Sequence, residues 1–185
     1  MFSLVIDIGC GQCHFYSYIK KYIDKYVGVD IIRYDSVPNG ITVICCDLNE
    51  DIIPIEEQAD LVVSIETIEH LENPRSFFRN LVRLTKPGGL IAVSTPNNLS
   101  LRSIGSLLLR GHFAAFQEGN GNYPAHITAL LEIDLLRLAK ENHLINMNIG
   151  YSNKGKIPWL SFYWPSFLKG KLFSDNIVLL AQKPI

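Results

Sequence analysis

Apolar runs of strand length alternate with amphipathic stretches through the first half of the chain. Each run is nearly continuous in apolar residues, which predicts strands that are buried on both faces. The predicted strands are residues 2–8, 26–31, 42–48, 59–66 and 90–95, and helical spacing predicts helices at 15–22 and 74–85. Residues 86–89, Lys-Pro-Gly-Gly, predict a turn before the fifth strand. The alternation predicts an α/β domain with a parallel sheet that is covered on both sides.

The rhythm changes after residue 97. Residues 98–128 form a long connection with one short predicted helix at 101–109. A helix is then predicted at 130–143, and the last two strands at 145–150 and 176–182, on either side of an aromatic-rich connection at 151–175. We therefore expect a single domain over residues 1–185, with residues 98–128 as an insertion.

Composition and charge narrow the class of protein. The 185 residues carry a net charge of -1, so we expect no nucleic-acid partner, which would require a basic surface. Residues 1–97 have a net charge of -5 and residues 98–185 a net charge of +4, so the first half suits a cationic ligand. The sequence shows no signal peptide, no apolar run of the ~18 residues that a membrane span needs, and no secreted disulfide framework. We expect a cytoplasmic protein.

A glycine loop follows the first predicted strand in the segment Asp7-Ile8-Gly9-Cys10-Gly11. Glycine accepts a positive φ and lets a ligand approach bare backbone, which a nucleotide-like ligand needs at a strand-to-helix turn.

Aspartates end the second and third predicted strands. Asp30 could accept hydrogen bonds from both hydroxyls of a ribose, and Asp47 from the exocyclic amine of adenine. Each aspartate alone could equally be a helix cap or a solvated strand end. Together with Asp7 behind the glycine loop they favour a ligand. The dinucleotide pattern is not met, because residue 14 is His and not the third glycine, and an acidic rim suits a cationic ligand better than a pyrophosphate.

In these motifs the sequence resembles the class I S-adenosylmethionine-dependent methyltransferases, in particular their small-molecule, ubiquinone-biosynthesis-like branch. The matching segments lie within residues 4–97: residues 7–11, 29–30, 46–48, 60–71 and 84–90. The resemblance implies a Rossmann-like, doubly wound, seven-stranded sheet of order 3-2-1-4-5-7-6 with strand 7 antiparallel. Its crevice would lie between strands 1 and 4.

The resemblance also implies roles for the glycine-loop residues. The backbone of Gly9, Cys10 and Gly11 should contact the methionine part of S-adenosylmethionine, and Asp7 should steer its amino group. Ser64 should lie below the sulfonium.

The same resemblance assigns the nucleoside part. Asp30 should bind the ribose hydroxyls while Ile31 packs on the adenine, and Asp47 and the Leu48 amide should bind the adenine edge. The product would be S-adenosylhomocysteine.

Two departures from the family pattern matter. Cys13 stands where the family has its third small residue. The sequence begins at the first strand and so lacks the usual N-terminal helix that covers the cofactor. We expect residues 98–128 to act as an acceptor-side lid, with Phe113, Phe116 and Tyr123 beside Gly111, Gly119 and Gly121, or a partner to take this place.

Two histidines are candidate catalytic residues. His70 follows the fourth strand and would act as a base if the acceptor is a hydroxyl, or would be bonded to local backbone. His126 precedes a helix in the expected acceptor region, or has a capping or packing role. The histidines are scattered and neither cysteine pair has a second pair at zinc spacing, so we expect no metal site.

Three function classes follow. The first is a methyltransferase that acts on an unidentified small molecule, such as a sugar, a lipid or a biosynthetic intermediate. The second is a catalytically weak, methyltransferase-like binding or scaffold protein. The third is a thioredoxin-like redox protein, because Cys10-Gly11-Gln12-Cys13 also resembles a thioredoxin motif.

The aromatic stretch 157–168 has three interpretations. It could pack against the sheet, form a homodimer surface, or contact a membrane surface, since lysines flank it on both sides.

Overall fold

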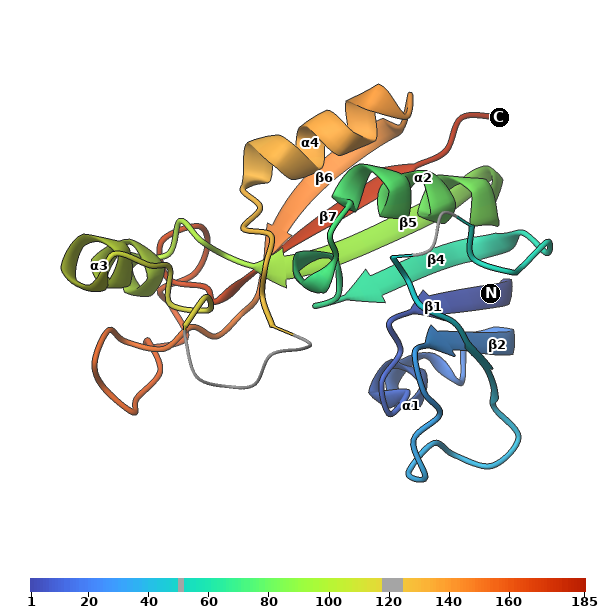
Figure 1. Ribbon diagram of the computed structural model, residues 1–185, viewed down its shortest axis with the longest axis horizontal. Coiled ribbons are helices and arrows are strands. Elements are labelled where there is room, and N and C mark those ends of the chain that lie inside the picture. The colour runs from blue at the N-terminus through green and yellow to red at the C-terminus, as the bar shows by residue number, and fades with distance from the viewer. Residues whose placement is uncertain (50–51, 118–124) are drawn as a thin grey trace.

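The computed structural model describes residues 1–49, 52–117 and 125–185 (Figure 1). The strands in these ranges are β1 (Phe2–Ile8), β2 (Ile23–Asp30), β3 (Thr42–Cys45), β4 (Ala59–Ile65), β5 (Thr85–Pro96), β6 (Ile145–Tyr151) and β7 (Asn176–Gln182). The helices are α1 (His14–Ile19), the 3-10 helix η1 (Ile68–His70), α2 (Pro74–Leu84), α3 (Leu101–Arg110) and α4 (Glu132–Glu141).

The strands form one sheet of seven strands in the order β3-β2-β1-β4-β5-β7-β6. Strands β1 to β5 run parallel, and β7 is antiparallel to both β5 and β6. The predicted order and the antiparallel seventh strand are confirmed. β1 lies between β2 and β4. The strands that follow β1 in the sequence are therefore added first on one side of it, as β2 and β3, and then on its other side, starting with β4. The carboxyl ends of β1 and β4 therefore flank a topological switch point, where ligands bind in such sheets.

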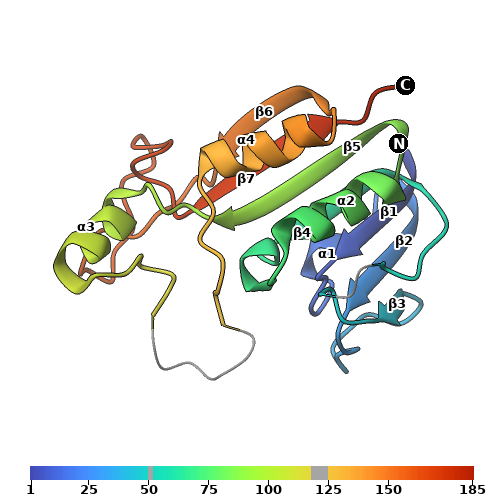
Figure 2. The same ribbon diagram turned by 45° about the horizontal axis from the view of Figure 1, so that its top comes forward.

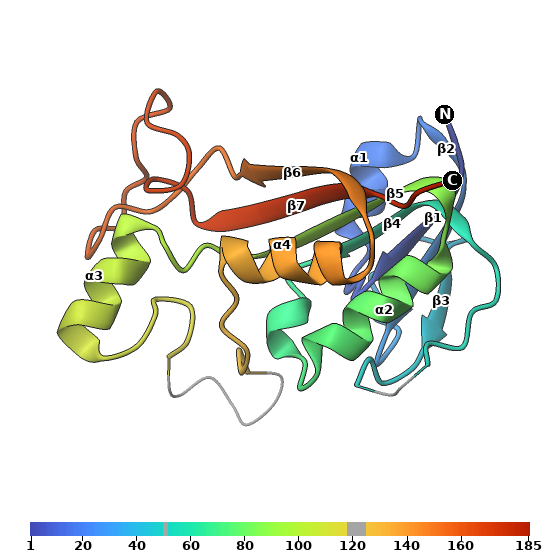
Figure 3. The same ribbon diagram turned by 90° about the horizontal axis from the view of Figure 1, so that it is seen from above.

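Helices cover both faces of the sheet (Figure 3). On one face, α2 and α4 pack the buried side chains of Phe77, Leu81 and Leu135 against the strands. On the other face, α1 lies over a smaller apolar cluster that includes Val5 and Tyr26. Strands between two apolar layers must be apolar on both sides, which explains the nearly continuous apolar runs in the sequence.

The third strand is shorter than predicted. It ends at Cys45 and not at residue 48, so Asp47 follows the strand and does not end it. The Oδ1 atom of Asp47 accepts hydrogen bonds from the backbone N of Asn49 at 2.9 Å and from its Nδ2 at 3.2 Å. This local turn competes with strand pairing and takes the chain out of the sheet.

The Lys-Pro-Gly-Gly turn that the sequence predicts before the fifth strand is part of that strand. β5 begins at Thr85, directly after α2, and its pairing with β4 shifts register between Ala59 and Leu61. Gly88, at a φ of +78°, has a backbone conformation that glycine favours inside this irregularity. The second strand starts at Ile23, earlier than predicted, because Ile23 pairs with Phe2.

Two segments extend beyond the carboxyl end of β5, away from the sheet (Figures 1 and 2). One is α3, which begins where the Ser100 side chain accepts a hydrogen bond from the Ser103 backbone N and ends at Gly111 in the left-handed conformation. The other is the connection between β6 and β7. Gly119, Gly121 and Tyr123 of the predicted lid lie outside the described residues. Within the described part of the chain, no helix is long and apolar enough to cross a membrane.

Candidate active site

A cavity of about 400 Å³ lies at the carboxyl ends of β1, β2 and β4. Its lining comes from the glycine loop, from the segments after β2 and β3, and from η1. The lining residues are Gly9, Asp30, Ile31, Ile32, Tyr34, Asp47, Leu48, Glu66, Thr67, His70 and Leu71. The cavity therefore brings together all four residues that the resemblance assigns to the nucleoside part of the ligand, and it also includes the candidate catalytic residue His70.

Gly9 is required by the geometry of the loop. Its φ is +76°, and a side-chain carbon at this position would overlap the hydroxyl and methyl of Thr67. The backbone N of Gly9 donates to the carbonyl of Val29 at 2.8 Å, which connects the loop to β2. Thr67 is held in place by its own hydroxyl, which donates to the Ile65 carbonyl at 3.1 Å. The loop is therefore clamped between β2 and the end of β4.

Asp30 holds the loop and faces the cavity. Its Oδ2 accepts the backbone N–H of Gly11 at 2.7 Å, and its Oδ1 accepts that of Ile31 at 2.8 Å. A carboxylate has about four acceptor positions, so each oxygen retains capacity for a ligand hydroxyl. The Ile31 and Ile32 side chains are half exposed beside it. Ile32, Tyr34 and Thr67 are lining residues that the sequence analysis missed, although the apolar side chains directly after Asp30 were a usable signal.

Asp7 lies beneath the loop and does not line the cavity. Its carboxyl is buried, the Tyr26 hydroxyl donates to Oδ2, and Oδ1 has no hydrogen-bond partner among the described residues. Burial raises the pKa of Asp7 to about 6, with the charge of Asp30 adding to the effect and the Tyr26 hydrogen bond opposing it. Ser64 is fully buried in β4 and does not line the cavity either.

Cys10 and Cys13 pack under the glycine loop as free thiols. A side-chain carbon on Gly28 would lie 2.6 Å from the Cys10 Sγ, so the thiol fills the space that this glycine leaves. Burial raises the pKa of both thiols. A redox pair of the thioredoxin type has a lowered thiol pKa, so these two cysteines do not fit that chemistry.

His70 also lines the cavity, from η1. Its Nδ1 lies 3.1 Å from the backbone oxygen of Ala125. Because a carbonyl can only accept, Nδ1 carries the proton, and in the neutral ring Nε2 keeps its lone pair.

His126 packs edge-on against His70, with ring centroids 4.5 Å apart, and against Phe116 at 5.4 Å. The backbone N atoms of Ile127 and Thr128 donate to the Glu69 carbonyl at 2.9 and 3.0 Å. Burial, and then the neighbouring His70, lower the pKa of His126. The described ends of the segment 98–128 therefore contact the cavity wall, while its role as a lid stays a prediction.

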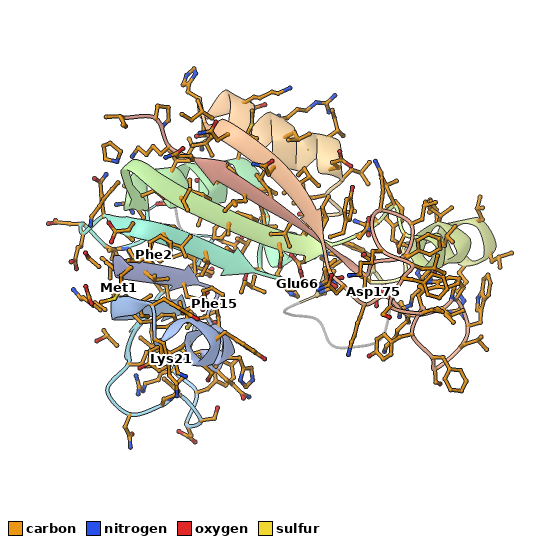
Figure 4. All side chains as sticks on the ribbon, turned by 180° about the vertical axis from the view of Figure 1, so that it is seen from behind. Met1, Phe2, Phe15, Lys21, Glu66 and Asp175 are labelled. Atoms are coloured by element: carbon orange, nitrogen blue, oxygen red, sulfur yellow. The ribbon has the colours of Figure 1, made fainter. Side chains whose placement is uncertain are left out.

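Two glutamates lie close to His70 in the sequence, and of these Glu66 lines the cavity while Glu69 does not. Glu66 has a φ of +51°, unusual for a residue with a side chain, and its Oε1 accepts from the Ser94 hydroxyl at 2.7 Å. Glu66 also contacts the Asn176 side chain, and Figure 4 shows it beside Asp175 where the chain enters β7. Glu69 is fully buried, and burial, followed by the charge of Glu66, raises its pKa to about 8. The carboxylate oxygens of Glu69 have no hydrogen bond of 3.5 Å or less to the described residues.

Glu69, His70 and His126 offer ligand atoms that all lie within 4.8 Å of one another. One carboxylate and two imidazoles form a donor set that suits a divalent transition metal. The sequence analysis expected no metal site because the histidines are scattered along the chain, and that expectation stays untested. The structure nevertheless places two of these histidines side by side.

The methyltransferase domain family matches residues 3–140. The chain belongs to this family. It is 32% identical over 127 residues to the mitochondrial ubiquinone biosynthesis O-methyltransferase of Dictyostelium discoideum, an alignment that covers 56% of this chain and 38% of that protein. It is 24% identical over 189 residues to the ubiquinone biosynthesis O-methyltransferase of Roseobacter denitrificans, covering 97% of this chain and 73% of that protein. The match to the first of these relatives thus spans well under two thirds of its length.

A solved structure shares the fold of this methyltransferase-family chain. The SAM-dependent methyltransferase from Archaeoglobus fulgidus superimposes with a TM-score of 0.70 at 20% identity, covering 98% of this chain and 86% of that one. The predicted membership of the class I S-adenosylmethionine-dependent methyltransferases is confirmed at the level of family and fold.

Proposed function

We propose that this chain is an S-adenosylmethionine-dependent methyltransferase that acts on a hydroxyl oxygen of a small molecule. The observation that carries the proposal is the cavity itself, where a glycine loop and two aspartates share the lining with a histidine whose Nε2 forms no hydrogen bond to the described residues. The names of the relatives as O-methyltransferases support an oxygen acceptor. Whether that acceptor is a sugar, a lipid or a biosynthetic intermediate stays open.

The glycine-loop side fits the methyl donor. Asp30 accepts from the ribose hydroxyls, Ile31 packs on the adenine, and Asp47 with the Leu48 amide binds the adenine edge. Asp7 supports the fit, because its unpartnered buried Oδ1 lies below the loop where the cationic amino end would be held. When bound, S-adenosylmethionine supplies a methyl group that its sulfonium already activates.

The histidine side fits the acceptor. His70 can take the proton of the acceptor hydroxyl on Nε2 while its Nδ1–H stays bonded to Ala125. The remaining work of the chain is to align the acceptor with the methyl group and to exclude water. All four cysteines are free, which supports a reducing compartment, and we place the protein in the cytoplasm on that ground.

Calorimetric titration with S-adenosylhomocysteine tests the donor site. Removing the Asp30 side chain leaves ligand hydroxyls and two backbone N–H groups unpaired, so Asp30→Ala should weaken binding by ~1–3 kcal/mol, about five- to 150-fold. Asp35→Ala, an exposed aspartate outside the cavity lining, is the matched control and should bind normally. Equal affinity of both variants would remove Asp30 from the site, and binding of NADH in place of the product would contradict the donor assignment.

Transfer of an isotopic methyl group into a metabolite extract tests turnover. A labelled product supports the enzyme. Tight binding of S-adenosylhomocysteine without any labelled product, over a range of extracts, would favour the methyltransferase-like binding protein.

A further inference from the structure

A second cavity, of about 360 Å³, lies between α3 and the connection that joins β6 to β7. Its lining is cationic and aromatic and includes Arg102, Arg110, Lys156, Trp159 and Tyr163. It shares no lining residue with the cavity at the glycine loop. The proposed function therefore assigns it no task.

Large apolar side chains of α3 and of the connection are exposed to solvent. Phe167 is 80% exposed, Leu108 78% and Phe162 70%, and Leu109, Trp159 and Leu160 are also exposed. A folded monomer rarely exposes so many large apolar side chains in one region unless the surface binds something.

The apolar side chains are held outward by a defined structure. Within the connection, Lys156 and Tyr163 pair as an antiparallel bridge, and the Ile157 backbone N donates to the Phe162 carbonyl at 2.9 Å. The Trp159 ring lies over Gly105 of α3, where a side-chain carbon would come within 3.3 Å of it. The absence of a side chain at Gly105 thus leaves room for the Trp159 indole against the middle of a helix, a position where glycine is otherwise unfavourable.

The charge of the surface has one sign. Residues 98–117 and 151–175 carry two arginines and four lysines against one acidic residue, Asp175. Lys171 pairs with Glu132 at 2.9 Å, and Arg102 lies 3.7 Å from Asp175. Among the described residues, no ion pair forms at the side chains of Arg110, Lys154, Lys156 and Lys169.

We propose that α3 and residues 154–171 dock this chain on an anionic lipid surface. Phe162 and Phe167 would enter the boundary between headgroups and acyl chains, and the cavity lined by Arg102, Arg110 and Lys156 takes a headgroup phosphate. A second copy of the chain fits less well, because a two-fold interface places the same patch on both sides and would bring these cations face to face. The docking surface lies at the carboxyl edge of the sheet that also carries the glycine loop, so a lipid-borne acceptor would arrive on the side of His70.

Vesicle flotation tests the proposal without any methyl donor. The probes are phosphatidylcholine vesicles with and without phosphatidylglycerol. We expect the chain to float with the anionic vesicles, to stay in solution with the neutral ones, and to be released by salt.

Two variant pairs locate the surface. Phe162→Ser with Phe167→Ser, and Arg110→Glu with Lys156→Glu, should each lower binding to anionic vesicles by roughly tenfold or more. The matched controls lie on and after α1: Tyr18→Ser with Tyr22→Ser, which are 80% and 64% exposed, and Lys20→Glu with Lys21→Glu. These should float like the unaltered chain, and all variants should retain binding of S-adenosylhomocysteine, which shows that they fold.

Several outcomes would overturn the proposal. One is equal flotation with neutral and anionic vesicles, and another is an equal loss of flotation in the α1 controls. A third is the absence of flotation together with a dimer that Phe162→Ser and Phe167→Ser dissolve in sedimentation velocity. Because the readout is lipid binding alone, its failure leaves the proposed methyl transfer untouched, and a failure of methyl transfer leaves the docking surface untouched.

Discussion

The two walls of the cavity at the glycine loop are built in different ways. The glycine-loop wall is formed by Asp30 at the end of β2 and by Gly9 and Asp47 in the loops after β1 and β3. Asp30 and Asp47 accept hydrogen bonds from nearby backbone N–H groups. The histidine wall, formed by Glu66 and His70, adjoins the buried Glu69 and the ring of His126, and burial shifts the pKa values of Glu66, Glu69 and His126. The difference leads to a prediction that follows from the proposed function: variants of the glycine-loop wall should change ligand binding, and variants of the histidine wall should change the rate of methyl transfer.

The largest effect that separates the walls should come from His70→Ala. As the proposed general base, His70 should be needed for turnover, so its loss should lower turnover by ~10²–10⁴. The affinity for S-adenosylhomocysteine should change by less than a few fold, because the proposed function gives His70 no contact with the methyl donor. Single-turnover methyl transfer and calorimetry on the same sample measure the two quantities. His14→Ala, an exposed histidine on α1, should change neither. Full turnover in His70→Ala with an oxygen acceptor would remove the distinction between the walls.

Gly9→Ala changes the glycine-loop wall. This variant should lower the affinity for S-adenosylhomocysteine and the free energy of unfolding. It combines an unfavourable positive φ, worth ~1–2 kcal/mol, with the overlap on Thr67, worth a further ~1–3 kcal/mol. Gly40→Ala is the matched control, because Gly40 has a φ of +86° but nothing within 4 Å of the added carbon. Urea unfolding should show the larger loss for Gly9→Ala, and calorimetry should show weaker product binding for this variant alone. Equal losses would mean that the Thr67 clamp does not matter.

Glu69→Gln tests the raised pKa next to the histidine wall, because the effect of this substitution on stability should depend on pH. The pKa of Glu69 is about 8 in the folded chain against an ordinary value of 4.5, so the folded state binds this proton more tightly than the unfolded state. The glutamate therefore destabilises the fold progressively as pH rises from 4.5 through 8. With a metal chelator present, Glu69→Gln should raise the free energy of unfolding at pH 8 by up to about 4 kcal/mol and have little effect near pH 4. The exposed Glu72→Gln serves as the control, and a parallel pH profile for both variants would contradict the shifted pKa.

The smallest effect should come from the cysteines below the glycine-loop wall. Cys10→Ala combined with Cys13→Gly removes both thiols, and glycine suits the φ of +57° at Cys13. Product affinity should stay within about tenfold, ~1.4 kcal/mol, because the thiols only fill space. Thiol titration of the unaltered chain should show two slowly reacting groups here. A reversible Cys10–Cys13 disulfide with a thioredoxin-like potential would reverse this interpretation.

The glycine-loop wall was predictable because its residues are tied to strand ends. An apolar run that stops at Asp30 and another that runs into Gly9 show where the chain leaves the sheet, and parallel strands bring such ends to one edge. Asp47 was correctly predicted to lie at the carboxyl edge of the sheet, but it follows β3 and is not its last residue. The sequence does not reveal that its side chain competes with strand pairing. Ser64 was expected at the sulfonium, and the structure buries it in β4.

The histidine wall was only partly predictable. His70 follows a strand and could be found in the same way as Asp30. Its contact with His126 depends on the path of the whole connection between β5 and α4, and one sequence carries no periodic signal for so distant a pairing. The raised pKa of Glu69 depends on the same packing, because burial is its first cause.

The connection between β6 and β7 closes on itself at its base. The Ser152 backbone N donates to the Asn176 carbonyl at 3.0 Å, the Asn176 backbone N donates to the Ser152 hydroxyl at 3.2 Å, and the Ser174 hydroxyl donates to the Ser152 carbonyl at 2.5 Å. Because β6 and β7 are antiparallel neighbours, this neck sets their register whatever lies beyond it, and loop closure costs little more as a loop lengthens. The sequence and length of the connection can therefore change in evolution without disturbing the pairing of β6 with β7. Selection can change the surface on which a protein of this fold works while its ligand-binding strand ends stay as they are.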